Sequence, residues 1–140
     1  MPLTQTLPFI EEKLVAYLKT YVALTAITST RISTQLPASP VFPSLKLTRV
    51  GGTPDRWGYD FPIIQFDCYG STQQTAMAVV EKTFKAVMEL PYVAPIQGAV
   101  NIGSADPSTP LNYLPDRDLQ DAQGKPQPRY IFAVVFRVSQ

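Results

Sequence analysis

The sequence predicts an α+β fold: a mostly antiparallel sheet of four to six strands, two helices packed on one face, and long ordered loops. Two segments space their apolar residues as helices do, and several others alternate with the period of strands. Only the second helix leaves room for a parallel crossover, which favours antiparallel pairing elsewhere. At 140 residues, the chain is expected to form a single domain over residues 1–140.

The first expected element is an amphipathic helix over residues 8–21, "PFIEEKLVAYLKTY". Its apolar face consists of Ile10, Leu14, Tyr17, Leu18 and Tyr21. Pro8 suits the first turn, where its missing N–H has no partner to lose, and Glu11 and Glu12 lie at the positive end of the helix dipole. One side of this helix is therefore expected to dock on the sheet.

Three strands are expected next. The first lies around residues 28–35, in a segment rich in Thr and Ile, and closely spaced prolines then exclude regular structure. The second is "SLKLTRVGG", which Gly51 and Gly52 end. The third is "FPIIQFDCYG", over residues 61–70, with one clearly apolar face.

The second helix is expected to begin at a capping box formed by Ser71 and Gln74 and to end at about residue 90, before Pro91. Its apolar stripe is predicted to contain Ala76, Met77, Val80, Phe84, Val87 and Met88. Glu81 and Lys85 form an i,i+4 pair on the opposite face.

The last third of the chain contains two predicted strands and an arm between them. "GAVNIGS", residues 98–104, predicts a short fourth strand, and residues 104–128 predict a long irregular arm in which "LNYL" forms at most a brief strand. Structureless loops of this length are uncommon unless they are functional or disordered. The closing "RYIFAVVFRVS" is apolar on both faces, which indicates a central strand buried on both sides or a strand whose second face is covered by a partner subunit.

Composition excludes several functions. The net charge is +1 and no basic block occurs, which disfavours DNA binding through clustered cations. The sequence has no histidine, and a lone Cys68 forms neither an internal disulfide nor a thiolate zinc site, so no cofactor or metal is expected. No run approaches the ~18 apolar residues of a membrane span and no signal segment is visible, so the protein is expected in a reducing cytoplasm.

Two groups of acidic residues could in principle form a calcium site or a catalytic carboxylate pair. Asp116, Asp118 and Asp121 resemble the start of a calcium loop, but the required glycine and final glutamate are missing, which favours a solvated loop. Asp55 and Asp60 lie in a turn-rich loop where Asp is common for local hydrogen bonding.

Two further residues are candidates for catalysis in the strand "FPIIQFDCYG". Asp67 lies on its mixed face, whereas Cys68 is in phase with Ile64 and Phe66 and is therefore expected to be a buried apolar residue. No catalytic residue is predicted.

The loop before this strand contains Arg56, Trp57 and Tyr59. These residue types are enriched at protein interfaces, because each buries a large area and still offers polar contacts. The alternative is a tryptophan folded over the core of its own chain. The residues alone leave both interpretations open.

The overall pattern resembles the small tail terminator, or tail completion, proteins of long-tailed bacteriophages. The likeness covers most of the chain and includes "TRISTQLP", "FPSLKLTRVGG" and "PRYIFAVVFRV". Its most specific part is the "P-x-x-Q-x-D-x-Y-G" strand from Pro62 to Gly70, which leads into the second helix.

The resemblance implies a non-enzymatic subunit of a six-membered ring at the head-proximal end of the tail, assembled in the host cytoplasm. Such a ring ends the growth of the tail tube and gives a head-tail connector protein a surface to join, while DNA passes through without sequence-specific binding. The expected partners are copies of itself, the tail tube protein and the connector protein. The residues hypothesised to contact a neighbouring subunit or the tube are Arg56, Trp57, Tyr59, Leu111, Tyr113, Leu114 and Arg117.

Three alternatives remain at this stage. One is a different ring at the head-to-tail junction, such as a head completion or connector subunit. Another is a small soluble enzyme that uses Asp67 or Cys68. The third is a ligand-binding or toxin-neutralising module.

Overall fold

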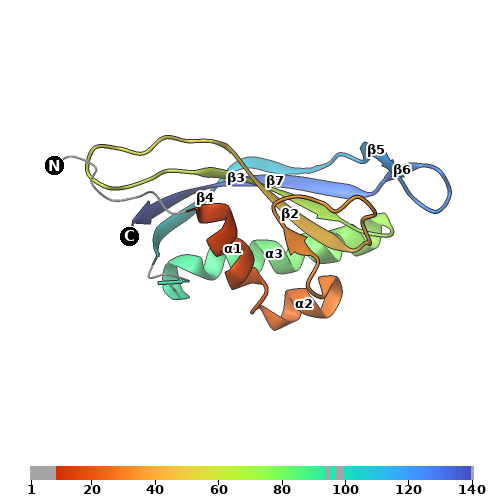
Figure 1. The fold of residues 1–140 in the computed structure, drawn as a ribbon, viewed down its shortest axis with the longest axis horizontal. Coiled ribbons are helices and arrows are strands. Elements are labelled where there is room, and N and C mark those ends of the chain that lie inside the picture. Colours follow the sequence, from red (N-terminus) through yellow and green to blue (C-terminus); the bar gives the residue numbers. More distant parts are fainter. Residues whose placement is uncertain (1–8, 94, 97–99, 140) are drawn as a thin grey trace.

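A five-stranded sheet carries three helices on one face in the computed structural model, which describes residues 9–93, 95–96 and 100–139 (Figure 1). The elements are α1 (Ile10–Leu18), α2 (Val22–Thr28), β1 (Ile32–Ser33), β2 (Ser44–Gly51), β3 (Ile63–Tyr69), α3 (Gln73–Val93), β4 (Asn101–Tyr113), β5 (Asp116–Gln120), β6 (Pro126–Gln127) and β7 (Arg129–Ser139). The predicted α+β class is confirmed, with one helix more than expected.

The strand order is β1-β2-β3-β7-β4, and β5 pairs with β6 in a separate small sheet. The β1–β2 pair is parallel and the other neighbours are antiparallel. β7 lies between β3 and β4, which confirms that the last strand is central. Its helix-facing side chains are buried, whereas Ile131 and Val135 on the opposite face are only half-buried. None of the described helices covers that opposite face (Figure 1).

The core lies between the sheet and the helices. Phe66 of β3 stacks on Phe132 of β7 with ring centroids 4.9 Å apart, and Phe136 meets Phe66 edge-on at 6.5 Å. Leu14 and Leu18 of α1 are fully buried against the same core, as the predicted helical face requires.

The stripe predicted for α3 is partly wrong. The residues that α3 buries are Ala76, Val79, Val80, Thr83, Ala86, Val87 and Leu90. Met77 and Met88 are only partly buried, and Phe84 is 40% exposed. Apolar residues cover more than one face of this helix, and the face with the smaller side chains packs on the sheet, where it allows a close approach.

The N-terminal segment differs most from prediction. Helix α1 ends at Leu18, and a second helix, α2, occupies residues that were expected to lead into a strand, so that only Ile32 and Ser33 pair with β2. Leu24 and Thr28 are fully buried, and α2 packs against α3. Tertiary packing here overrides the strand preference of Thr and Ile. Pro8, expected in the first helical turn, lies outside the described residues.

The predicted capping box is displaced by one residue. Thr72 Oγ1 accepts a hydrogen bond from the backbone N–H of Thr75 at 3.1 Å, and the hydroxyl of Ser71 instead donates to the carbonyl of Phe42 at 3.4 Å. The helix then continues beyond Pro91 to Val93. A proline this close to the C-terminus removes a hydrogen bond only from the last turn, so the disruption stays local.

The fourth strand is much longer than predicted. β4 pairs with β7 as far as Tyr113, whereas a short strand over residues 98–104 and an irregular arm from residue 104 were expected; residues 98 and 99 lie outside the described residues. Three register shifts interrupt the pairing. The last two accommodate Pro107 and Pro110, which have no N–H to donate and are tolerated because β4 is an edge strand. The projecting part of the arm is therefore only the segment around β5 and β6.

We predict that Phe66→Ala lowers the free energy of unfolding by about 3–5 kcal/mol, because it leaves a cavity against Phe132 and Phe136. Phe84→Ala is the matched control: Phe84 also contacts Phe132, at 5.6 Å, but is 40% exposed, so its loss should be much smaller. Urea denaturation followed by circular dichroism measures both variants. Equal losses would contradict this description of the core.

Candidate subunit interfaces

A rigid turn forms the tip of the segment that joins β2 to β3. Asp55 Oδ1 accepts hydrogen bonds from the backbone N–H groups of Trp57 at 2.8 Å and Tyr59 at 3.0 Å, and Gly58 adopts a φ of 93°. The backbone N–H of Asp55 donates to the carbonyl of Tyr59 at 2.8 Å. Asp55 therefore has the turn-forming role expected for this position. We call residues 55–59 the hairpin tip.

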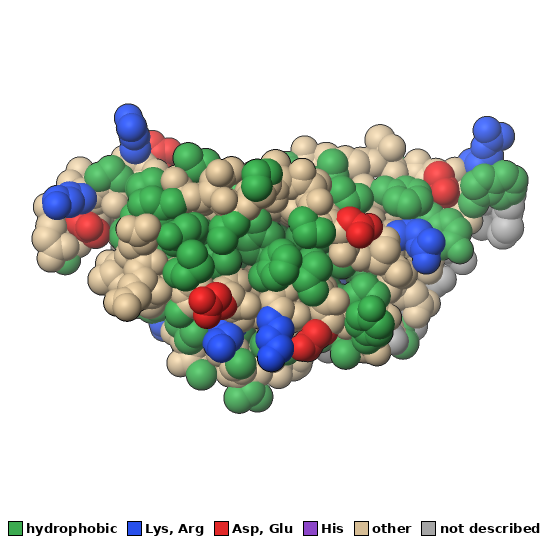
Figure 2. Space-filling model, turned by 180° about the vertical axis from the view of Figure 1, so that it is seen from behind, with side chains coloured by type: hydrophobic (Ala, Val, Ile, Leu, Met, Phe, Trp, Pro, Cys, Tyr) green, Lys and Arg blue, Asp and Glu red, His purple; other side chains and the backbone are tan. Residues whose placement is uncertain are grey.

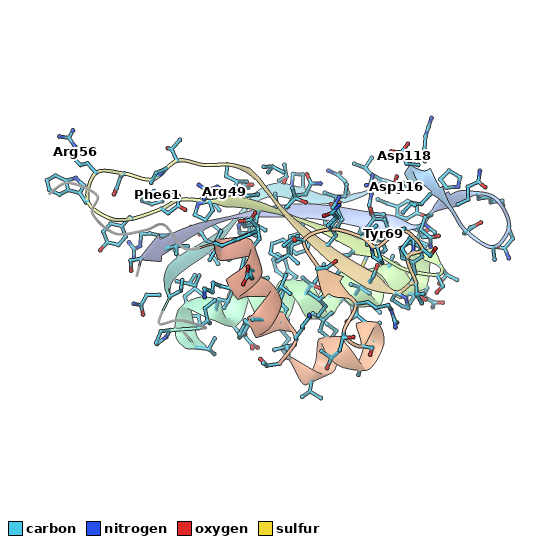
Figure 3. All side chains as sticks on the ribbon, viewed as in Figure 1. Arg49, Arg56, Phe61, Tyr69, Asp116 and Asp118 are labelled. Atoms are coloured by element: carbon cyan, nitrogen blue, oxygen red, sulfur yellow. The ribbon has the colours of Figure 1, made fainter. Side chains whose placement is uncertain are left out.

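The hairpin tip displays its aromatic side chains outward at one end of the sheet, where Arg56 is labelled in Figure 3. Trp57 is 68% exposed and Tyr59 is 41% exposed. The guanidinium of Arg56 lies 5.9 Å from the centroid of the Trp57 ring, and that of Arg137 lies 5.8 Å from the Tyr59 ring. Trp57 is therefore not part of the core of its own chain, and an interface role for it stays a prediction.

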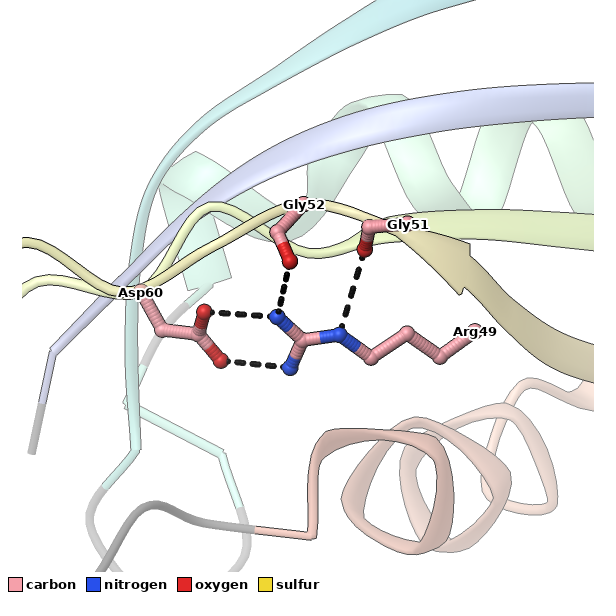
Figure 4. A network of polar contacts seen from close by, with 4 residues as sticks. All are labelled: Arg49, Gly51, Gly52 and Asp60. Carbon is pink, nitrogen blue, oxygen red and sulfur yellow. Dashed lines mark hydrogen bonds and ion pairs between the residues drawn. The ribbon is translucent and has the colours of Figure 1, made fainter.

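An ion pair connects the base of the loop between β2 and β3 to the sheet (Figure 4). We call this loop the projection. Arg49 of β2 donates two hydrogen bonds to the carboxylate of Asp60, at 2.7 and 2.8 Å, and two more to the carbonyls of Gly51 and Gly52, at 3.2 and 3.1 Å. The Asp60 side chain is only 1% exposed. Hydrogen bonding to Asp60 raises the pKa of Arg49 above its ordinary value, so the guanidinium stays charged.

Asp60 also links the projection to the end of β7. Its backbone N–H donates to the carbonyl of Val138 at 2.9 Å and its own carbonyl accepts from the N–H of Val138 at 2.8 Å. Gly52 completes the base with a φ of 90°, where an added Cβ would collide with the backbone of Phe61. We call the Arg49–Asp60 pair with these bonds the hairpin clasp.

A second clasp holds the arm at the opposite end of the sheet, near the labels of Tyr69, Asp116 and Asp118 in Figure 3. The hydroxyl of Tyr69 donates to Asp116 Oδ2 at 2.8 Å, and the Arg129 guanidinium lies 3.5 Å from the same oxygen. Arg129 Nε also donates to the carbonyl of Leu114 at 2.9 Å. Burial, together with the bond to Asp116, raises the pKa of Tyr69, so its hydroxyl remains a donor.

The predicted contact residues therefore form two separate groups. Arg56, Trp57 and Tyr59 lie on the hairpin tip, whereas the second group follows the end of β4 toward Asp116 and Asp118 at the other end of the long axis (Figure 3). Leu111 lies further back along β4, beside α3. The arm group is Leu111, Tyr113, Leu114 and Arg117. All of these residues are exposed; Leu111 is 43%, Tyr113 is 37% and Leu114 is 49% exposed.

Sequence reasoning missed a groove between α3 and β4. Its volume is about 490 Å³, and apolar side chains of both elements line it, among them Met77, Phe84, Pro107 and Leu111. Figure 2 shows hydrophobic side chains gathered across the middle of this face. The sequence feature that could have indicated the groove is the number of apolar residues on α3, which exceeds what one buried face needs. The prediction placed these residues in the core. We call this feature the α3–β4 groove.

The carboxylates considered for catalysis are engaged in structural contacts. Asp55 holds the hairpin tip, Asp60 belongs to the hairpin clasp, and Asp67 is 3% exposed and accepts a hydrogen bond from Gln65 Nε2 at 2.8 Å. Cys68 is fully buried, and this burial raises the pKa of its thiol. The thiol is therefore protonated near neutral pH and is not presented as a nucleophile.

The acidic residues of the arm do not converge. Asp116 belongs to the second clasp, and Asp121 Oδ1 accepts hydrogen bonds from the N–H groups of Gln123 and Lys125, both at 2.9 Å. Within the described part of the chain, no group of three or more His, Cys, Asp or Glu side chains has the arrangement of a metal site. No helix there is both long enough and apolar enough to cross a membrane.

Comparison with known proteins gives one informative result. No family model matches the chain, and no curated protein sequence matches it either. Its fold is similar to that of a chain in a solved structure described as the virion of a native gene transfer agent (GTA) particle. The TM-score is 0.63 and the identity is 14%, with 94% of this chain and 95% of that chain covered. The likeness at this identity concerns the fold.

We predict that Asp60→Ala lowers the free energy of unfolding by about 2 kcal/mol, because it leaves the Arg49 guanidinium with half of its partners. Amide hydrogen exchange over residues 52–62 should also accelerate. Asp118→Ala, which removes an exposed carboxylate from the arm, is the control and should change neither quantity. Unchanged exchange in Asp60→Ala would show that the clasp does not order the projection.

We also predict that Cys68 resists alkylation by iodoacetamide at pH 8 in the folded protein and reacts rapidly in urea. The unfolded thiol ionises near pH 8.5, whereas the folded thiol, with its raised pKa, does not. Folding should therefore become less favourable as the pH rises above this value, and Cys68→Ala should reduce that dependence. Rapid alkylation without urea would restore Cys68 as a candidate nucleophile.

Proposed function

We propose that this chain is a virion structural protein that forms a ring on the end of a phage tail tube, ends the growth of the tube and provides the surface that joins the head. The observation that carries the proposal is the display of interface-type residues on two clasped projections at opposite ends of one subunit. The sequence resemblance to tail terminator proteins and the fold likeness to a virion chain support it.

The arrangement of the two groups suits a ring. In a ring, one patch of each subunit meets a different patch on its neighbour, and rotation closes the contact. The hairpin tip and the arm lie at opposite ends of the sheet, so head-to-tail packing places unlike ends together (Figure 3). Six subunits, as in the terminators that the sequence resembles, would leave a central hole through which DNA passes.

The proposal assigns no catalytic role to the chain. Asp55, Asp60 and Asp67 are held in hydrogen bonds that build the fold, and Cys68 is buried with a raised pKa. The partners proposed are further copies of the chain, the tail tube protein and a head-tail connector protein. The protein would then reside at the head-proximal end of the virion tail.

A head completion or connector ring is the rival assignment, since it also needs head-to-tail contacts. Purified tail tubes distinguish the two, because a terminator caps their ends whereas a connector ring does not bind bare tubes. Negative-stain images of tubes mixed with the protein give the answer. Tubes that remain uncapped and continue to grow would overturn the terminator assignment.

We predict that Trp57→Ala weakens ring formation and tube capping by about 30-fold or more, because central tryptophans commonly contribute ~2 kcal/mol or more to binding. Tyr92→Ala is the matched control: Tyr92 is an aromatic residue, 89% exposed, outside both groups of contact residues. Native mass spectrometry and titration of tube ends measure the two effects. Intact rings and intact tail joining in both Trp57→Ala and Arg56→Ala would contradict the interface assignment.

A further inference from the structure

The α3–β4 groove is formed by side chains that a solitary subunit leaves in water. Phe84 is 40% exposed although its ring meets Phe132 edge-on at 5.6 Å, and Leu111 across the groove is 43% exposed. A volume of about 490 Å³ lies within the range of ~300–1,000 Å³ found for sites that enclose sizeable groups. The groove therefore has the size and the apolar lining to receive a large aromatic side chain.

The charges at the edge of the groove restrict what fits it. Glu81 and Lys85 lie on its α3 side, both exposed. They are spaced as an i,i+4 pair, yet among the described residues they form no ion pair with each other. Glu81 can therefore pair with a cation of an occupant, while Lys85 beside it can pair with an anion. A suitable occupant combines a large aromatic side chain with an adjacent cation.

The hairpin tip has this combination. The Arg56 guanidinium lies 5.9 Å from the ring centroid of Trp57, and Trp57 is 68% exposed. The neighbouring carboxylate of Asp55 accepts two backbone hydrogen bonds within the turn, so it is oriented into the tip. Arg and Trp stacked in this way form a compact unit that loses little conformational freedom when it binds.

The hairpin tip does not fill the groove of its own chain. It projects beyond the end of the sheet, whereas the groove lies between α3 and β4 on the face shown in Figure 2. The hairpin tip and the groove are different surfaces of one chain. Contact between the tip of one copy and the groove of another would be heterologous, and contacts of this kind can close rings.

We propose that the hairpin tip of one copy inserts Trp57 into the α3–β4 groove of the next copy, with Arg56 paired to Glu81. The occupant of the groove is thus a second copy of this chain. This contact rests on the proposed ring, since it specifies which surfaces close it. It also extends the expected interface from the arm residues to α3, through Glu81 and Phe84.

Charge reversal tests the pairing. Arg56→Glu and Glu81→Arg should each raise the concentration for half-maximal ring assembly on tail tubes by about tenfold. The double variant should recover to within about threefold of the unmodified chain. The matched control combines Arg56→Glu with Glu12→Arg, which reverses an exposed carboxylate on α1 and should restore nothing. Absence of recovery in the Arg56→Glu, Glu81→Arg chain would overturn the pairing.

Cross-linking tests the contact without relying on charge. A Tyr59→Cys population, which keeps Trp57 and Arg56, mixed with a Leu111→Cys population in the presence of tail tubes and bismaleimidoethane, should give a covalent dimer. Neither population alone should give one, and the buried Cys68 of the unmodified chain should not react. Dimers within one population, or a cross-link from Leu111→Cys to the tube protein, would overturn the proposal.

The two proposals fail in different ways. Rings that form normally while both charge reversals and the cross-link give no effect would reject the tip-in-groove contact and leave the ring standing. A cross-linked dimer with no ring and no capped tubes would reject the terminator role and retain the contact between copies.

Discussion

The ion pair between Arg49 and Asp60 is the constraint on which the shape of one end of the molecule depends. It joins β2 to the part of the loop that leads from the hairpin tip into β3. The backbone of Asp60 also forms hydrogen bonds with Val138 of β7. Because Asp60 is almost completely removed from water, its carboxylate needs both of the hydrogen bonds that Arg49 donates to it. A lysine at position 49 would supply a charge without the two parallel bonds.

At the other end of the sheet, the second clasp also holds a projecting segment through a carboxylate, but with different residues. Tyr69 and Arg129 converge on Asp116, and Arg129 also holds the carbonyl of Leu114. Both projections are thereby attached to the sheet by side chains of its own strands. Preorganised surfaces of this kind lose less entropy on association than mobile loops do.

Much of the fold could be predicted, because the spacing of apolar residues within each segment determines whether it forms a helix or a strand. β2, β3 and β7 follow from alternation, and the capped helix α3 follows from its spacing, although its cap is Thr72 and not Ser71. Helix α2 could not be predicted, because burial against α3 outweighs the strand preference of its residues. The extension of β4 past Pro107 could not be predicted either, since it depends on distant pairing with β7.

The candidate interfaces were predictable by residue type but not by position. Trp57 and Arg56 are of interface type, and only the structure shows that they lie outside the core. Predicting the groove would have required knowing which face of α3 packs on the sheet. The sequence does not show this, because α3 is apolar on more than one face. The partner of Arg49 was likewise hidden, because Asp55 lies nearer to Arg49 in the sequence than Asp60 does.

The prolines of β4 have a consequence for separate copies of the chain. β4 is one edge of the sheet, and an unprotected edge of this length would invite strands from other copies to add to it without limit. Pro107 and Pro110 offer no N–H, and the shifts in register around them break the regular row of donors and acceptors. Aggregation of separate copies through this edge is therefore disfavoured.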